Sequence, residues 1–258
     1  MKRVIVCCKW VPDGLDIRVD EHTRKLNLER VKWILNDFDR NSIEAGVQLK
    51  AATDCELVGI TAGVNAGNSA KDVLSRGLDA LYYLDSPLLE HADSRTTSKA
   101  LAALVEKLGG ADLVLCSEAS DDEFVQQTSA RLAALLGYAS VTYVQGIAVS
   151  GGAVQLSRKL EDGLEEVEVS GPAVLSVVPD INDPPIPGIR QILGAKKKPA
   201  TAVLWDELGI TGAEPQLRTE SVLAPEVKRK KIQLTEGGTS IKDAVQKLLG
   251  HLTSDGVF

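Results

Sequence analysis

Hydroxyl and amide side chains gather at two points where the sequence predicts the start of a helix. One stretch runs from Asp93 to Thr97, and the other runs from Ser117 to Thr128. The first N–H groups of a helix have no acceptor within it, so helix starts bind anions such as a pyrophosphate. Simple capping of their own helices by Ser94 and Ser120 is the competing interpretation. We favour a phosphate ligand because both starts fall at the same edge of one predicted sheet.

Other catalytic chemistries receive less support from the sequence. Asp121, Asp122 and Glu123 are adjacent acids that would suit a hydrolase or ligase, but such a run is more typical of a solvated first helical turn. The sequence contains no Gly-x-Gly-x-x-Gly after its first strand, no P-loop and no Gly-x-Ser-x-Gly. An ordinary dinucleotide dehydrogenase, a P-loop NTPase and an α/β-hydrolase are therefore disfavoured, and we assign no catalytic residue.

Metal sites and reactive thiols are not indicated either. The three histidines have no partner at ligand spacing, and the four cysteines include no Cys-x-x-Cys pair. Cys7, Cys8 and Cys116 lie in apolar, strand-like runs, where cysteine behaves as a small hydrophobic residue. The run Lys196–Lys198 is typical of a solvated loop.

The composition limits the class of protein. The 258 residues carry 29 basic and 36 acidic side chains, a net charge of −7, and only 4% are aromatic, which disfavours nucleic-acid binding. A hydrophobic content of 44% with 25% charged residues is typical of a soluble globular protein. No apolar run approaches the roughly 20 residues that cross a bilayer, and Met1 leads into a strand-like run without a leader. We therefore expect a cytoplasmic protein.

The elements that must position these residues alternate along the first part of the chain. Short apolar runs alternate with helical patterns, which predicts an α/β fold with a Rossmann-like parallel sheet flanked by helices. Strands are predicted at 4–8, 57–61, 81–84 and 113–116. Helices are predicted around 43–50 with Asn41 or Ser42 as the cap, at 69–76 with Gly77 as the stop, at 94–108 and at 124–136.

Beyond Gly137 the pattern changes to a β-hairpin region. Strands are predicted at 141–149, 153–160, 164–169 and 173–178, with Asp162-Gly163 as a hairpin turn. Residues 180–199 predict an irregular loop, and residues 205–231 predict an extended arm. A C-terminal amphipathic helix starting at Ser240 is predicted from Ile241, Ala244, Val245, Leu248 and Leu249.

We divide the chain into a nucleotide-binding α/β domain, residues 1–200, and a C-terminal arm and helix, residues 201–258. The arm and helix have few local burial partners in the sequence, so we expect them to dock on another subunit. Packing back on their own domain is the alternative.

Several motifs, in this order and spacing, are similar to those of one family. They are Val6-x-Cys8-Lys9-x-Val11-Pro12-Asp13, Asn36-Asp37-Phe38-Asp39 followed by Ile43-Glu44-Ala45, Lys71–Gly77, Leu160–Gly163, and Asp180–Pro184 with Ile192–Pro199. With these motifs the chain resembles the beta subunit of electron transfer flavoproteins along nearly its whole length. The segment 180–199 is similar to the partner-recognition loop of the branch associated with nitrogen fixation and carnitine metabolism.

The resemblance implies cofactors and partners. It implies a heterodimer with an alpha subunit that holds an electron-carrying FAD. The beta subunit binds a second adenine nucleotide, which is structural AMP in the respiratory type and a second FAD, reduced by NADH, in the electron-bifurcating type. The bifurcating type carries Asp-(Thr/Ser)-x-x-Thr near the FAD diphosphate, and Asp93 to Thr97 match it, so FAD is favoured over AMP. The implied partners are an acyl-CoA-type dehydrogenase or quinone oxidoreductase, with ferredoxin or flavodoxin if electrons are bifurcated.

The resemblance also implies roles for individual residues. Those beside the adenosine are Cys7, Asn36, Phe38 and Ala62. Those near the ribose and phosphates are Asp93, Ser94, Thr97, Ser120, Asp122, Gln126, Gln127 and Thr128. The residues implied in partner recognition are Ile186, Ile189 and Ile192. The family's phosphate loop often carries a basic residue, and the segment from Ser117 to Asp122 has none. A freestanding adenine-nucleotide-binding module of the universal-stress type is the remaining alternative.

Overall fold

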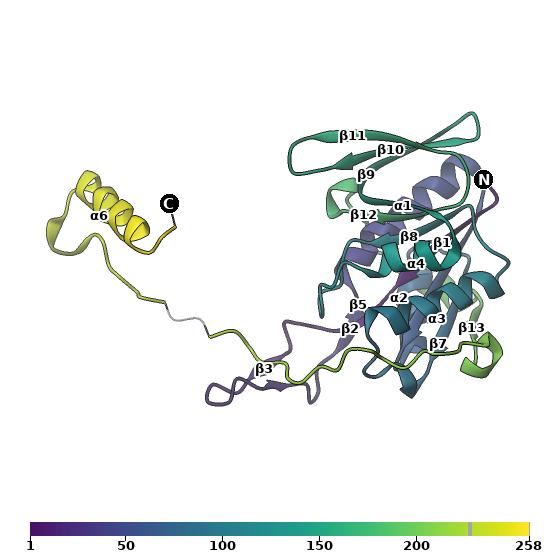
Figure 1. Cartoon of the computed structure of the whole chain (residues 1–258), viewed down its shortest axis with the longest axis horizontal. Helices are drawn as coiled ribbons and strands as arrows, with labels where there is room; N and C mark the ends of the chain where they lie inside the picture. The colour runs from purple at the N-terminus through teal and green to yellow at the C-terminus, as the bar shows by residue number, and fades with distance from the viewer. Residues whose placement is uncertain (227–228, 258) are drawn as a thin grey trace.

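A nine-stranded sheet forms the centre of the protein (Figure 1). The computed structural model describes residues 1–226 and 229–257. The strands of the sheet are β1 (Arg3–Cys8), β6 (Glu56–Gly63), β7 (Ala80–Asp85), β8 (Leu113–Ser117), β9 (Ala139–Ser150), β10 (Ala153–Lys159), β11 (Leu164–Val169), β12 (Ala173–Val177) and β13 (Ala200–Ala202). Their order is β11-β10-β9-β12-β8-β1-β6-β7-β13. Neighbours are parallel from β9 to β13, and β10 pairs antiparallel with both β9 and β11.

Helices cover both faces of the parallel part of the sheet. The helices are α1 (Asp37–Thr53), α2 (Ala70–Ser75), α3 (Ser94–Lys107), α4 (Thr128–Leu136), α5 (Ile189–Ala195) and α6 (Ile241–Ser254). Alternate residues of a strand point to opposite faces, so Val4 and Val6 of β1 pack with side chains of α1 and α2, whereas Ile5 packs with α3 and α4. Burial on both faces explains why these strands are continuous apolar runs.

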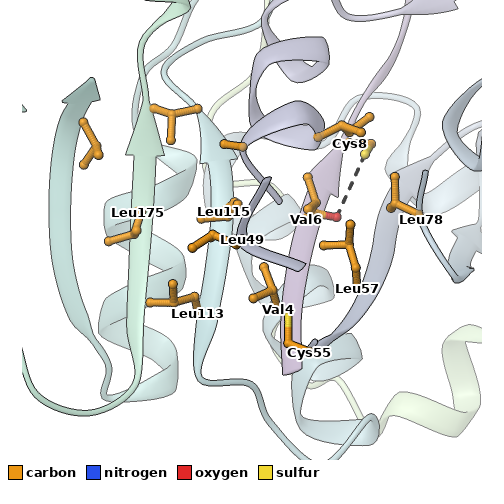
Figure 2. Close-up of a cluster of buried hydrophobic side chains, with 14 of the residues drawn as sticks. Val4, Val6, Cys8, Leu49, Cys55, Leu57, Leu78, Leu113, Leu115 and Leu175 are labelled. Atoms are coloured by element: carbon orange, nitrogen blue, oxygen red, sulfur yellow. Dashed lines mark hydrogen bonds between the residues drawn. The ribbon is translucent and has the colours of Figure 1, made fainter. Parts of the chain in front are cut away.

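The side chains between the sheet and α1 belong to a buried hydrophobic cluster, which Figure 2 shows in close-up. Val4, Leu57 and Leu115 come from three adjacent strands, and Leu49 comes from α1. Gly46 allows α1 to lie close to the sheet, because a Cβ at this position would be 2.8 Å from Leu57 Cδ1. Gly46 therefore allows the middle of α1 to pack directly on the sheet.

The predicted fold class is confirmed. The parallel sheet with helices on both faces is present, and all eight predicted strands agree with the structure within two residues at each end. The helix stop at Gly77 also agrees, because Gly77, with a φ of 122°, follows Arg76, the C-cap residue of α2.

The predicted start of α1 is wrong. The helix begins at Asp37 with Asn36 at its N-cap position, whereas Asn41 and Ser42 lie inside the helix and are buried. The side-chain amide of Asn41 donates hydrogen bonds to the carbonyls of Pro179 and Asn182, at 3.0 and 2.8 Å. The side chain of Asn41, which the local sequence indicated as a helix cap, therefore makes a long-range contact instead.

The predicted start of α4 is also wrong. The helix begins at Thr128 instead of Phe124. Phe124 and Gln126 have φ values of 50° and 56°, which a right-handed helix does not allow. The residues before Thr128 consequently form a loop that leads into the start of α4.

The segment predicted as an irregular loop, residues 180–199, is partly regular. It contains α5 and leads into β13, which pairs with β7 at the edge of the sheet. The ammonium group of Lys198 donates hydrogen bonds to the carbonyls of Leu74 and Leu78, at 3.1 and 2.6 Å. The prediction that the lysine run is simply solvated is therefore wrong for Lys198.

Two small antiparallel ribbons were not predicted. The strands β2 (Trp10–Pro12) and β5 (Trp33–Leu35) form one ribbon, and β3 (Arg18–Val19) and β4 (Leu26–Asn27) form the other. Short 3₁₀ turns complete the structure at η1 (Ala66–Ser69), η2 (Pro87–Leu89), η3 (Pro179–Ile181), η4 (Trp205–Leu208) and η5 (Glu236–Gly238). The β2–β5 ribbon lies between β1 and the start of α1 in the chain.

The C-terminal arm runs along the body of the protein after β13. Thr96 and Lys99 of α3 donate side-chain hydrogen bonds to carbonyls at 211–213, and the amide of Ala224 donates to the carbonyl of Arg24. Val227 and Lys228, which belong to the predicted arm, lie outside the described residues.

The predicted C-terminal helix is confirmed as α6. It starts after Ser240, whose hydroxyl accepts a hydrogen bond from the amide of Asp243. Ile241, Val245, Leu248 and Leu249 are exposed, and Figure 1 shows α6 apart from the sheet. Among the described residues, no helix has the length and apolar character needed to cross a membrane.

Candidate functional site

A cavity of about 440 Å³ lies at the carboxyl ends of β1, β6 and β8. The strand ends contribute Cys7, Ala62 and Cys116 to its lining, and the starts of two helices contribute Ser94 and Thr128. Open parallel sheets bind ligands at this edge, because the strands end there and the following helices begin there. The cavity is therefore the first candidate for a binding site.

The starts of α3 and α4 lie side by side at this cavity. The hydroxyl of Ser94, the first residue of α3, donates a 3.0 Å hydrogen bond to the side chain of Gln127, the residue before α4. In α3, the side chain of Asp93 accepts from the amide of Thr96, which leaves the amides of Ser94 and Arg95 without an acceptor inside the helix. Two helix starts that meet in this way favour an anionic ligand.

The start of α4 has no side-chain cap. Its N-cap residue, Gln127, makes no capping hydrogen bond, and the amide of Arg131 makes the first hydrogen bond of the helix to the carbonyl of Gln127. The amides of Thr128 and Ser129 precede that bond, and both residues line the cavity. A ligand with acceptor oxygens would satisfy these amides.

Asn36 joins the start of α1 to the loop after β8. Its side-chain amide donates to the carbonyl of Ala119 at 3.1 Å, and its side-chain oxygen accepts from the amide of Asp121 at 3.1 Å. The carboxylate of Asp121 in turn accepts from the amide of Asp37, the first residue of α1, at 2.8 Å. Asp121 therefore stabilises the start of α1. It is exposed, as expected, but it does not lie in the first turn of α4, which begins at Thr128.

Asp39 is a buried carboxylic acid in the wall of the cavity. It accepts hydrogen bonds from the backbone amide of Lys9, at 2.6 Å, and from the hydroxyl of Ser117. Burial raises the pKa of Asp39 to about 7, although these hydrogen bonds act in the opposite direction. The protonation state of Asp39 therefore changes near neutral pH, beside the site.

Lys9 places a positive charge beside the segment from Ser117 to Asp122, which contains no basic residue of its own. Its ammonium group lies 2.8 Å from Asp122 and 2.9 Å from Glu123, and it also contacts the hydroxyl of Ser120. Burial on its own would lower the pKa of Lys9, but the two carboxylates raise it above its ordinary value. Sequence reasoning did not assign Lys9 to the site, although its place directly after β1 was the available signal.

The structure brings most of the expected nucleotide-binding residues together. Nine of the twelve line the cavity: Cys7, Asn36, Ala62, Ser94, Thr97, Ser120, Asp122, Gln126 and Thr128. The other three lie outside the lining. Phe38 packs edge-on against Phe124 with ring centroids 5.8 Å apart, Gln127 accepts hydrogen bonds from Ser94 and Arg131, and Asp93 binds backbone amides.

The cysteines at the cavity are buried thiols. Cys7, Cys8 and Cys116 are free and buried, as is Cys55. The contact with Cys116 and burial raise the pKa of Cys7 well above its ordinary value, and burial does the same for Cys8. A protonated thiol is a poor nucleophile, so this environment agrees with the role of a small hydrophobic residue.

The expected partner-recognition residues lie away from the cavity, on and before α5. Ile186 is 93% exposed and Ile189 is 78% exposed, whereas Ile192 is half-buried. Leu193, one turn beyond Ile189, is also exposed. Ile186, Ile189 and Leu193 therefore form an exposed apolar surface, which we call the α5 surface.

A comparison with known families identifies the fold. A family model described as electron transfer flavoprotein domain matches residues 23–207. The chain belongs to this family. The electron transfer flavoprotein match covers the starts of α1, α3 and α4 and the whole α5 surface, and it ends inside η4, before most of the arm.

Proposed function

We propose that this chain is the beta subunit of a heterodimeric electron transfer flavoprotein and that its cavity binds FAD. The observation that carries the proposal is the meeting of two helix starts, those of α3 and α4, at one cavity in a member of this family. A diphosphate carries two negative charges, and backbone amides at helix starts stabilise such charges without a basic side chain.

The residues around the cavity suit a dinucleotide. The free amides of α3 and α4, with the hydroxyls of Ser94 and Thr97, offer donors to the phosphate oxygens. Lys9 offsets the charge of Asp122 and Glu123, which would otherwise repel the ligand. When bound, FAD supplies the ring that accepts a hydride or single electrons, and the chain holds and orients it.

Structural AMP in the same cavity, as in the respiratory type, is the second candidate. It would occupy the same floor, at Cys7 and Cys116, but would extend no flavin toward Ser94 at the start of α3. The freestanding universal-stress type of module is less favoured, because the match to the electron transfer flavoprotein family includes the α5 segment.

The partners follow from two exposed surfaces. We propose that residues 201–258 dock on an alpha subunit that holds the second FAD, because α6 exposes Ile241, Val245, Leu248 and Leu249. We propose that the α5 surface contacts a redox partner of the acyl-CoA-type dehydrogenase or quinone oxidoreductase class. If the cavity flavin bifurcates electrons, NADH is the donor and ferredoxin or flavodoxin is the low-potential acceptor.

Counting flavins tests the proposal. The native complex is purified without added nucleotide, and FAD and AMP are released by heat and quantified against protein. A yellow heterodimer with two FAD per complex is expected. One FAD with one AMP would replace the FAD assignment by structural AMP, and a colourless homodimer with ATP would contradict the proposed function.

A further inference from the structure

Two tryptophans share one face of the β2–β5 ribbon at the mouth of the cavity. In the antiparallel register, Trp10 lies opposite Leu35 and Pro12 lies opposite Trp33. Directly opposed residues and residues two apart share a face of a sheet, so Trp10 and Trp33 are diagonal neighbours on one face. Such neighbours are close enough for aromatic side chains to form one continuous surface.

This aromatic face belongs to the cavity. Both Trp10 and Trp33 line it, together with Val64 and Asn65 from the loop after β6. The inner end of the face is anchored, because Leu35 is fully buried and Trp10 packs against the hydrophobic core. Trp33, in contrast, is 45% exposed, although tryptophan gains much from burial. The ring of Trp33 is thus partly exposed on a ribbon whose inner end is anchored in the core.

The position of the phosphate donors determines what this face could contact. Ser94 and Thr128, at the starts of α3 and α4, line the same cavity as Cys7 and Cys116 at the strand ends and as the two tryptophans. FAD carries two aromatic ring systems, adenine and isoalloxazine, one on each side of its diphosphate. AMP carries adenine alone. If the adenine occupies the floor, a second ring needs an apolar or aromatic wall elsewhere in the cavity, and the tryptophan face is such a wall.

We propose that the face formed by Trp10 and Trp33 packs against the isoalloxazine ring of the FAD in this cavity, and that Trp33 selects FAD over AMP. The inference rests on the proposed function, because it needs FAD in the site. Lys9, directly before Trp10, contacts Ser120 and Asp122 in the loop after β8. The β2–β5 ribbon, which carries both tryptophans, therefore begins next to that loop. Offset stacking between aromatic rings is favourable beyond the area that it buries.

The experiment compares ligands and variants on the full-length chain after removal of flavin. FAD and AMP are titrated separately by isothermal titration calorimetry, which gives both affinities, and tryptophan emission and the visible flavin spectrum are followed as further readouts. In the unaltered chain we expect FAD to quench the emission strongly and AMP to leave it almost unchanged. Trp205→Phe, at a tryptophan outside the cavity lining, is expected to retain both affinities.

The variant Trp33→Leu keeps an apolar side chain but removes the ring. We expect it to weaken FAD about tenfold and to change AMP affinity by less than about twofold, with Trp33→Phe in between for FAD. Thermal unfolding checks that each variant is folded. Equal losses of FAD and AMP affinity, or no loss of either, overturn the stacking role while leaving FAD binding intact. An unaltered chain that binds AMP but not FAD overturns the FAD assignment and the inference with it.

Discussion

The carboxylate of Asp93 accepts a 2.9 Å hydrogen bond from the amide of Gln216, more than a hundred residues later in the chain. Its other oxygen accepts from the amide of Thr96 at the start of α3. Burial on its own would raise the pKa of Asp93, but these amides and that of Leu217 lower it to about 2. One side chain thus caps the helix at the cavity and attaches the C-terminal arm to it.

Removal of this carboxylate should loosen the arm. We expect Asp93→Ala to lose about 1 kcal/mol of capping energy and to speed tryptic cleavage after Arg218 severalfold, because the amides of Gln216 and Leu217 lose their acceptor. Ser240→Ala removes the cap of α6 instead and should leave cleavage after Arg218 unchanged. Equal cleavage in the Asp93 variant and the unaltered chain would show that the arm is held without Asp93.

Asp39 should make stability fall as the pH rises. Its pKa is near 4 in an unfolded chain and about 7 in the folded protein, so the folded state binds the extra proton between these values. The free energy of unfolding is therefore expected to decrease from pH 4 to pH 7, by at most about 4 kcal/mol, and to level off above pH 7.

Asp39→Asn isolates this contribution. Its amide can donate to the hydroxyl of Ser117, which can then turn its own hydrogen to the carbonyl of Ala119, while its oxygen accepts from the amide of Lys9. Chemical denaturation at several pH values should show a gain of about 1–3 kcal/mol at pH 8 and little change at pH 4. A pH dependence as steep as that of the unaltered chain would assign it to other groups.

Lys9 should be needed for anion binding more than for folding. In Lys9→Met, the carboxylates of Asp122 and Glu123 lose their counter-charge beside the proposed diphosphate. We expect nucleotide affinity to fall about tenfold at low salt, with a smaller loss at high salt, where charges are screened. Lys9→Arg keeps the charge and serves as the control. Equal affinity for the Met and Arg variants would contradict this role.

The hydroxyls at the start of α3 should distinguish FAD from AMP. Each hydrogen bond to a charged phosphate contributes roughly 1.5–3 kcal/mol, so Ser94→Ala with Thr97→Ala should weaken FAD by about 3–6 kcal/mol if the terms add. The count of flavins per complex is then expected to drop from two to one, and NADH oxidation to disappear. Ser94→Thr with Thr97→Ser retains both hydroxyls and should retain the flavin. A double alanine variant with two flavins would contradict the assignment.

A charge on the α5 surface should impair partner docking alone. Ile189 is 78% exposed at the first position of α5, where a glutamate suits the helix start. We expect Ile189→Glu to leave thermal stability and bound flavin unchanged and to slow electron delivery to the physiological partner at least about tenfold. Leu15→Glu, at a residue that is 96% exposed in another loop, is the matched control. An unchanged rate for Ile189→Glu would exclude this surface.

The sheet could be predicted because its strands carry local signals. Val4 to Cys8 and Leu113 to Cys116 are short apolar runs buried on both faces, and Gly77 and Gly137 mark the ends of helices with positive φ. Such patterns depend on residues that are close in sequence. They do not depend on how distant segments meet.

The site could be predicted only in part, because its contacts join distant segments. Ser94 and Thr128 follow strand ends, so the common sheet edge brought them to one cavity. Lys9 meets Asp122, and Asn36 meets Ala119, across more than eighty residues, and no local pattern indicates such pairs. The start of α4 was misplaced for a related reason, since the positive φ of Phe124 is not favoured by its residue type.

The C-terminal end of α5 is held against the body of the protein. Ala195, at the end of α5, is buried, and Lys198 is bound to the end of α2 through the carbonyls of Leu74 and Leu78. A segment held in this way loses little conformational entropy when it associates, and three apolar side chains make only a small contact area. Encounters through such a surface form quickly and end quickly. If the α5 surface docks a redox partner, as proposed, a short residence time would let the chain leave that partner as readily as it meets it.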